Sequence, residues 1–255
     1  VQTNTVTFEA LLALGADGLD ELAGKVQPPA VGGDAQARYL VSGITFYAAR
    51  PEVGEARSLV EQAWLAALAG AEHREVKAFF MRRLQPCGTA ASRDALAGHL
   101  SDPTLTEPAA QALLAIAAPG TAARFLIALK AGQGDIKTIV QALGILAHDA
   151  AAEPIRALAA SEDLAIQAAA LDALAAIGPV KRWLGWDHDS YVLLSAACQT
   201  TNRYARSQAL GRCVRYAEKA HARGASKPAA LAVHSLLAMS RERGESAVQA
   251  AALAL

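Results

Sequence analysis

Apolar residues recur through the middle of the chain in a pattern that repeats about every 30 residues. Each repeat is marked by a leucine, and the successive leucines stand 29, 30 and 31 residues apart at Leu84, Leu113, Leu143 and Leu174. Other apolar residues stand four and three positions before each leucine and three positions after it. This spacing is the apolar stripe of an amphipathic helix. The pattern therefore predicts one helix per repeat, with these leucines in the core.

A break and a second apolar segment follow each of these helices. The breaks are Gly88, Pro119-Gly120, His148-Asp149 and Gly178-Pro179. Glycine can adopt the left-handed conformation that ends a helix, and proline cannot continue one. The second segments carry apolar residues about one period apart at Leu96, Leu126 and Ile155.

A polar linker closes each repeat, and acidic residues stand where the following helix needs a cap. These residues are Asp102, Asp135 and Asp163. A carboxylate at this position accepts the unpaired N–H groups of the first helical turn. Each unit is thus a helix, a tight turn, a second helix and a linker. One such hairpin cannot bury its apolar face alone, so that we expect neighbouring hairpins to stack into a solenoid.

Three parts of the chain differ in how well they follow this period. Residues 73–178 hold the regular repeats, and residues 1–72 read as an irregular helical cap with helices near 6–15, 17–26, 34–50 and 55–71. Residues 179–255 read as longer helical hairpins that continue the solenoid, with segments near 189–200, 202–223, 226–242 and 245–255. The expected fold is all-α, a right-handed α-α superhelix.

Composition supports a helical fold and a neutral surface. Alanine, the best helix former, accounts for 62 of the 255 residues, whereas aromatic residues make up only 5%. The 24 basic and 24 acidic residues balance, so that a dedicated nucleic-acid partner is not expected. No uninterrupted apolar run approaches the roughly 18 residues that a membrane span requires.

The repeats resemble HEAT repeats of the short bacterial type, which are related to phycobilisome-lyase HEAT-like repeats. The segments EVKAFFMRRLQPCG and TEPAAQALLAI also resemble the start of a group of large bacterial HEAT-repeat proteins. That resemblance implies an exported or periplasmic module of a larger protein, with a cytoplasmic location as the alternative. The early arginine that HEAT units usually carry is replaced here by Glu107, Lys137 and Ala165.

The sequence shows no convincing catalytic or metal-binding motif. Phosphate loops, dinucleotide fingerprints and nucleophile elbows are absent, and the six histidines form no ligand pair. The three cysteines, Cys87, Cys198 and Cys213, lack metal-ligand spacing. We therefore expect buried, inert thiols and neither a cofactor nor a metal.

The segment RWLGWDHDS is the strongest candidate for chemistry. It contains Trp183, Trp186, Asp187, His188 and Asp189. Aromatic rings beside carboxylates can bind a cationic or aromatic ligand, and HEAT-like DNA alkyl-base glycosylases use such a set. The interpretation we favour is structural. In it the tryptophans seal the junction between the repeats and the C-terminal hairpins, while Asp187 or Asp189 caps the next helix.

Two further groups of polar residues are candidates for binding a partner. A basic stripe follows one face of the helix expected at 202–223 and comprises Arg212, Arg215, Lys219 and Arg223. This stripe is either a solvated helix face or a docking surface for an acidic partner. The second helices of the repeats would line the inner surface of a solenoid, and they contribute Arg93, His99, Arg124, Lys130, Glu153 and Arg156.

These observations together predict a non-catalytic protein-interaction scaffold whose partner is another protein. Two alternatives stay open: a HEAT-fold enzyme, of the base-glycosylase or bilin-lyase kind, and a purely structural spacer. The enzyme would place Trp183, Trp186 and Asp187 near its centre.

Overall fold

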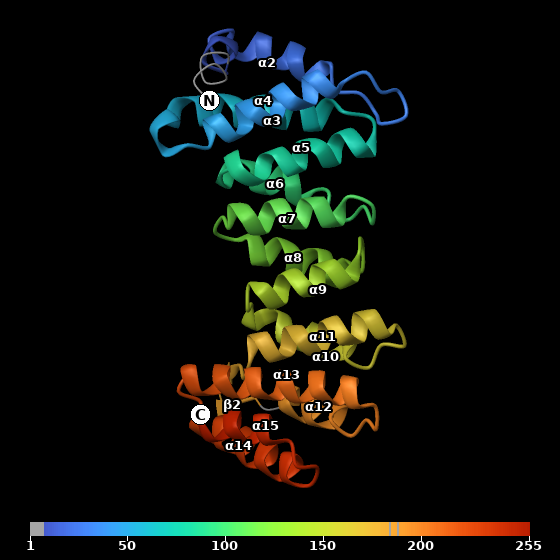
Figure 1. The fold of residues 1–255 in the computed structure, drawn as a ribbon, viewed down its shortest axis with the longest axis vertical. Helices are drawn as coiled ribbons and strands as arrows, with labels where there is room; N and C mark the ends of the chain where they lie inside the picture. The colour runs from blue at the N-terminus through green and yellow to red at the C-terminus, as the bar shows by residue number, and fades with distance from the viewer. Residues whose placement is uncertain (1–7, 184, 188) are drawn as a thin grey trace. The chain divides into compact units, whose positions relative to one another are not determined.

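The structure is a computed structural model that describes residues 8–183, 185–187 and 189–255. Within these residues the chain is all-α, as predicted, apart from one short β-hairpin (Figure 1). Contacts between the helices divide the chain into two compact units, Val1–Asp135 and Ile136–Leu255. The division predicted from the sequence, at residues 72 and 178, stays a prediction.

Unit 1 is built from helices that alternate along the chain with short loops. Its elements are α2 (Gly15–Gly24), α3 (Ala35–Ala48), η1 (Pro51–Val53), α4 (Gly54–Gly70), α5 (Arg74–Cys87), η2 (Ala90–Ser92), α6 (Arg93–Ala97), α7 (Thr106–Ile116) and α8 (Thr121–Ala131). Helix α5 packs against α3 and α4 on one side and against α7 on the other. The helices expected at 34–50 and 55–71 are α3 and α4. The segment expected at 6–15 lies partly outside the described residues.

Unit 2 begins with the remaining repeats and ends in longer helices. Its elements are α9 (Ile136–Ile145), η3 (Asp149–Ala151), α10 (Ala152–Leu158), α11 (Leu164–Ile177), β1 (Lys181–Arg182), β2 (Gly185–Trp186), α12 (Asp189–Ala197), α13 (Arg203–Ala222), α14 (Ser226–Arg241) and α15 (Ser246–Leu253). Helix α11 packs between α9 and α13, and α13 also packs against α12 and α14. The four C-terminal helices confirm the segments predicted there.

The leucines of the 30-residue period are core residues, as their spacing predicts. Leu84 and Leu113 in unit 1, and Leu143 and Leu174 in unit 2, are fully buried. Removing a leucine side chain from water contributes about 2 kcal/mol, and packing against neighbours adds to this. The repeated leucine is therefore the main sequence determinant of the helix pairs.

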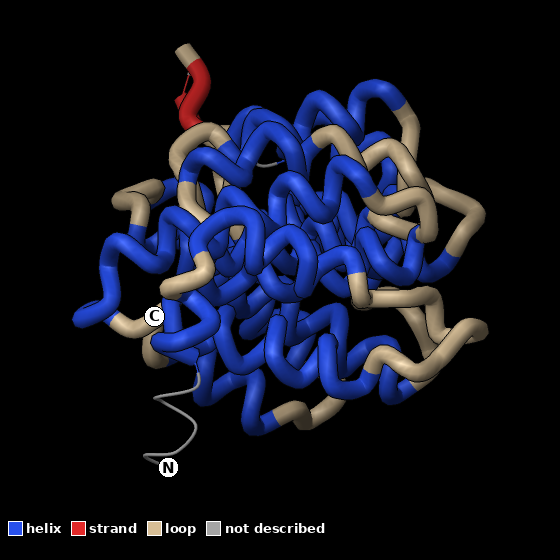
Figure 2. The backbone as a smooth tube through the Cα atoms, turned by 90° about the horizontal axis from the view of Figure 1, so that it is seen from above, coloured by secondary structure: helices blue, strands red, loops and turns tan. Residues whose placement is uncertain are grey.

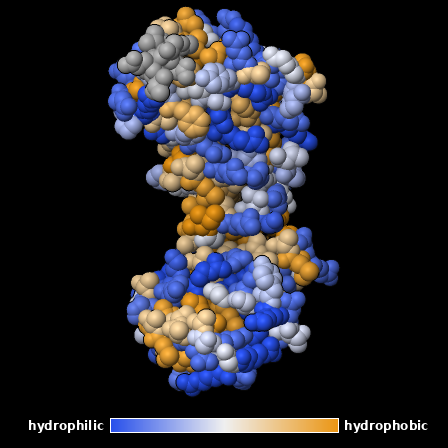
Figure 3. Space-filling view, in the orientation of Figure 1, coloured by the Kyte–Doolittle hydropathy of each residue, from blue (hydrophilic) through white to orange (hydrophobic). Residues whose placement is uncertain are grey.

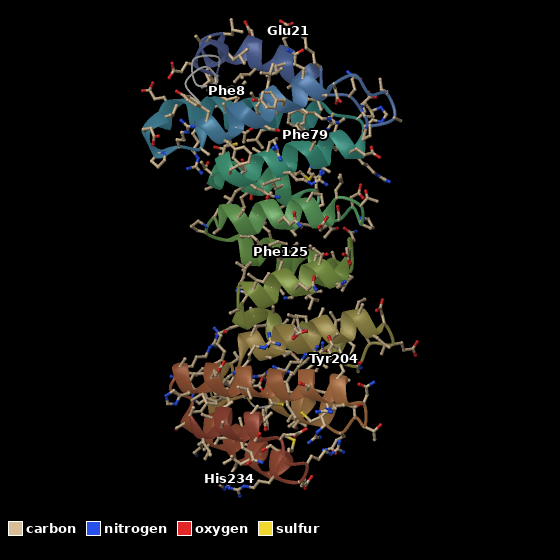
Figure 4. The ribbon with its side chains drawn as sticks, in the orientation of Figure 1. Phe8, Glu21, Phe79, Phe125, Tyr204 and His234 are labelled. Carbon is tan, nitrogen blue, oxygen red and sulfur yellow. The ribbon has the colours of Figure 1, made fainter. Side chains whose placement is uncertain are left out.

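The register predicted for the second helices is wrong at one position. Phe125 is fully buried on α8, whereas Leu126 is only half-buried, so that the repeated core positions are Leu96, Phe125 and Ile155 (Figure 4). A phenylalanine fills more core volume than a leucine. The larger side chain, that of Phe125, therefore determines which face of the short helix packs into the core.

The predicted caps are confirmed in one case. The carboxylate of Asp163 accepts from the N–H groups of Ala165 and Ile166 at the start of α11, at 2.8 and 3.2 Å. Asp102 does not cap α7, because its carboxylate accepts instead from the backbone N–H and the hydroxyl of Thr104 within the preceding turn. The capping role of Asp135 stays a prediction.

Arginine side chains bind the turns that follow several of the helices. In unit 1, Arg57 donates to the carbonyls of Cys87 and Gly88, both at 2.9 Å. Arg93 donates to the carbonyl of Pro119 at 2.6 Å. In unit 2, Arg223 donates to the carbonyl of Pro179 at 3.2 Å. These carbonyls lie at the end of a helix or just beyond it, and the guanidinium groups satisfy them.

Candidate interaction site

The described residues that stand out most in unit 2 belong to the β-hairpin between α11 and α12. Its strands pair antiparallel, with Lys181 opposite Trp186 and Arg182 opposite Gly185. Trp183 follows β1 directly and lies in the turn, where 92% of its surface is exposed. The two strands, drawn in red in Figure 2, stand out from the helices. The hairpin thus presents an indole ring and two basic side chains to solvent.

Asp187 fastens the base of this hairpin to the helices of unit 2. Its buried carboxylate forms an ion pair with Arg156 of α10 and lies 3.3 Å from the guanidinium of Arg182. Its other oxygen accepts from the backbone N–H of Asp189 at 2.8 Å, where α12 begins. Its carbonyl accepts from the hydroxyl of Tyr216 on α13 at 3.2 Å. One aspartate therefore connects the hairpin to three helices.

The structural interpretation of this segment is correct for one residue and wrong for another. Asp187 caps the start of α12, as expected, and Trp186 is half-buried beside it. Trp183 does not seal any junction, because it lies on the tip of the hairpin and away from the core. The sequence-based prediction also named His188, which lies outside the described residues. The indole of Trp183 and the carboxylate of Asp187 do not come together at one binding site.

The predicted basic stripe of α13 is only partly a solvated face, because Arg215 and Lys219 are exposed and Arg212 is buried. Arg212 is buried, and it makes two hydrogen bonds to the carboxylate of Asp172 on α11, at 3.1 and 2.9 Å. Arg215 pairs with the same carboxylate, and Arg223 pairs with Asp149 at 2.8 Å. Lys219 is exposed. The stripe therefore serves mainly to join α13 to the repeats of unit 2, since three of its four charges are paired there.

The candidate residues on the second helices fall into separate groups. In unit 1, Arg93 and Arg124 both pair with Asp94, at 2.8 and 2.9 Å, which leaves a net positive charge at this point. His99 is half-buried, and burial together with the positive charge of Lys77 holds its pKa below the ordinary value. Lys130 is exposed and is not part of the Asp94 cluster. We find no single site that gathers these residues within unit 1.

In unit 2, the second-helix candidates are Glu153 and Arg156 on α10. Glu153 is exposed, whereas Arg156 is mostly buried and is engaged by Asp187. Arg156 therefore binds Asp187 at the base of the hairpin and is not itself presented to a partner. Sequence reasoning missed Lys181 and Arg182 as site residues. Gly185, two residues after Trp183, could have indicated the turn of the hairpin. It adopts a φ of 127°, a backbone conformation that glycine adopts far more readily than other residues.

Other exposed apolar side chains are scattered. On the face drawn in Figure 3, apolar residues interrupt the polar surface of both units. In unit 2 the exposed aromatic residues other than Trp183 include Tyr204 at the start of α13, of which 73% is exposed (Figure 4). Single exposed apolar residues are normal on protein surfaces, so that exposure alone does not mark a site. Trp183 differs because it combines exposure with a braced, protruding backbone.

Residues 8–183, 185–187 and 189–255 contain no group of three or more histidine, cysteine, aspartate or glutamate side chains that could hold a metal ion. Among the same residues, no helix is both long enough and apolar enough to cross a membrane.

Comparison with known proteins gives no functional assignment. No family model matches the chain. No curated protein matches it either. Among solved structures, the chain is similar to an engineered protein with a TM-score of 0.47 and 19% identity, over 98% of this chain and 69% of that one. A second engineered protein gives a TM-score of 0.36 and 19% identity, over 92% of this chain and 93% of that one. Neither likeness is close enough to support an argument about function.

Proposed function

We propose that the chain is a non-catalytic protein-binding module and that its unit 2 holds a protein partner through the hairpin that carries Trp183. The observation that carries the proposal is the 92% exposure of Trp183 on a hairpin tip. A tryptophan contributes more apolar contact area than almost any other residue, and tryptophan is enriched among the residues that dominate binding energy. An indole held in water is therefore available for burial in a partner's pocket.

The bracing of the hairpin supports this role. Asp187 ties its base to α10, α12 and α13 through the contacts described above. A side chain presented on a rigid support loses less conformational freedom on binding than one on a loose loop. Lys181 and Arg182 directly precede Trp183, and both are exposed although Arg182 pairs with Asp187, so that a pocket with an acidic rim would match the charge of this site.

The repeated helix pairs are the second part of the proposal. We infer that the helix pairs of each unit are HEAT-like solenoid repeats of the bacterial type, carried within a larger and exported protein. The 30-residue leucine period and the packing of α5 between α4 and α7, and of α11 between α9 and α13, support it. A preformed helical surface binds without a folding cost at the moment of contact.

The proposal is tested by removing the indole and comparing partner capture. Trp183→Ala should lose the proteins that the wild-type chain retains from extracts of its source, because the central apolar anchor is gone. Tyr204→Ala is the matched control, since Tyr204 is an exposed aromatic residue of the same unit. It should retain the same partners as the wild type. A partner set unchanged by Trp183→Ala would refute the role of the hairpin.

An added measurement separates loss of binding from loss of folding. Trp183 is exposed and makes no core contact, so that its replacement should leave the unfolding midpoint in urea unchanged. With an isolated partner, titration calorimetry should show a loss of affinity of at least tenfold for Trp183→Ala, which corresponds to about 1.4 kcal/mol.

A further inference from the structure

Two of the three cysteines lie together in the core of unit 2. The Sγ atom of Cys198, at the end of α12, is 3.8 Å from the Sγ atom of Cys213 on α13. Both residues are fully buried, and both thiols are free. Cys87, by contrast, belongs to unit 1 and its thiol donates to the carbonyl of Arg83. The pair was not expected from the sequence, because 15 residues separate the two cysteines and no motif links them.

The distance is a contact from which a disulfide can form. A disulfide has its sulfur atoms about 2.05 Å apart, and a change of side-chain rotamer moves a sulfur atom by more than the difference. Helices α12 and α13 already pack against each other, so that the backbone is in place. The contact between the two sulfur atoms therefore places the pair within reach of closure by local side-chain movement.

The surroundings of the two sulfur atoms distinguish their roles. The hydrogen bond from Cys213 lowers the pKa of Cys198, burial opposes this, and the positive charge of Arg206 adds to the lowering. The pKa of Cys213 is raised, because its hydrogen stays in the bond to Cys198 and its surroundings are apolar. Cys198 is thus the sulfur that more readily becomes a thiolate, the form that attacks a disulfide.

The position of Cys198 gives a route for a reagent. Helix α12 has nine residues and ends at Ala197, and the next residue after Cys198, Gln199, is exposed. Arg206, which donates to the carbonyl of Cys198, lines a surface pocket of about 550 Å³ together with Thr201 and Ser207. Opening the last turn of a short helix costs little compared with global unfolding. The buried pair can therefore react without unfolding of the whole unit.

We propose that Cys198 and Cys213 form a dithiol redox site, which closes to an intramolecular disulfide by exchange with a small-molecule or protein disulfide. The Cys198 thiol loses its proton to solvent, its thiolate attacks one sulfur of the oxidant to form a mixed disulfide, and the other half of the oxidant leaves as a thiolate. That thiolate takes up the proton of Cys213. Cys213, now a thiolate, then attacks the Cys198 sulfur and displaces the second half of the oxidant, which takes up a proton from solvent. The protein loses two hydrogen atoms, and the oxidant becomes two thiols.

The test uses the folded full chain and oxidised glutathione. The reduced, folded protein is incubated with oxidised glutathione and quenched in acid; it is then unfolded in denaturant at near-neutral pH with excess N-ethylmaleimide, and analysed by intact mass and peptide mapping. The wild type should carry a single alkylated thiol, at Cys87, and a cross-linked peptide pair that is lighter than the two free peptides by two hydrogen atoms. Cys87→Ser, the matched control, should keep the cross-link and take up no label.

Single variants test the order of attack. Cys213→Ser should trap glutathione on Cys198, because the resolving thiol is missing, and Cys198→Ser should leave Cys213 free and alkylated after the acid quench. The proposal is overturned if the folded wild type yields no Cys198–Cys213 cross-link, or if the cross-link forms only in denaturant. It does not depend on the role of Trp183, because Trp183→Ala should form the same Cys198–Cys213 cross-link whatever its effect on partner capture.

Discussion

Gly144 on α9 lies directly against Ala173 on α11. A methyl group added at position 144 would stand 2.8 Å from the Cα atom of Ala173 and 2.9 Å from its Cβ atom. These distances are shorter than van der Waals contact, so that the two helices approach as closely as their backbones allow. The neighbouring Leu143 and Leu174 are fully buried in the same interface. Glycine is therefore required at this position by the space between the helices.

Replacing Gly144 with alanine should destabilise unit 2. Alanine is the better helix former by about 1 kcal/mol, but here its methyl group must push α9 and α11 apart. Overpacking of this kind costs about 1–3 kcal/mol, so that we expect a net loss in the free energy of unfolding measured in urea.

Gly211 provides the matched control. It lies within α13, and an added methyl group there meets no described atom within 4 Å. Gly211→Ala should therefore raise the free energy of unfolding by up to about 1 kcal/mol. A gain in stability for Gly144→Ala as large as that for Gly211→Ala would show that the two helices are not in close contact.

Replacing Asp187 with alanine should destabilise the base of the hairpin. Arg156 would be left mostly buried, with the exposed carboxylate of Asp189 as its remaining acidic neighbour, and loss of the main partner of a buried ion pair costs about 3–5 kcal/mol. The amide of Asp189, which donates to the Asp187 carboxylate, should exchange its hydrogen faster. Asp189→Ala should cost about 1 kcal/mol at most, because that carboxylate is exposed and lies 3.7 Å from Arg156. Equal losses for the two variants would contradict the anchoring role of Asp187.

The sequence predicted the helices and the repeated leucines because both depend on local periodicity. Leu84 and Leu113, for example, follow from their spacing and from the breaks after their helices. The sequence could not predict which arginines form ion pairs with which acidic residues, since the partner of Arg212 is Asp172, 40 residues away on another helix. The exposure of Trp183 was missed for a related reason. A tryptophan is usually buried, and only the hairpin geometry places this one in solvent.

The register of α8 is open to a direct test. Phe125→Ala should lower the free energy of unfolding by about 3–5 kcal/mol, because it removes a fully buried ring and leaves a cavity. Leu126→Ala should cost less than half of that, since Leu126 is only half-buried. Urea unfolding of the two variants decides between the registers. A larger loss for Leu126→Ala would restore the register predicted from the sequence.

Acid should weaken the link between α11 and α13 through Asp172. Partial burial alone would raise the pKa of Asp172, but hydrogen bonds and positive charge from Arg212 and Arg215 outweigh it, so that the pKa lies below the ordinary value of 3.8. A carboxyl group with a lowered pKa binds its proton more tightly in the unfolded chain than in the folded protein. Its contribution to stability is therefore complete above the unfolded pKa, and it is lost as the pH falls through the folded pKa.

Asp172→Asn isolates this contribution, because it removes the charge at every pH. At neutral pH the variant should be less stable than the wild type by about 1 kcal/mol, since the carboxylate is nearly half exposed and solvent screens its charge. The difference should stay constant down to about pH 5 and should shrink below about pH 4, as the wild-type carboxyl group is itself protonated. Urea unfolding of both proteins across this range measures it. A difference that is independent of pH would mean that Asp172 stabilises the two helices through packing, and that its pairing with Arg212 and Arg215 contributes nothing in solution.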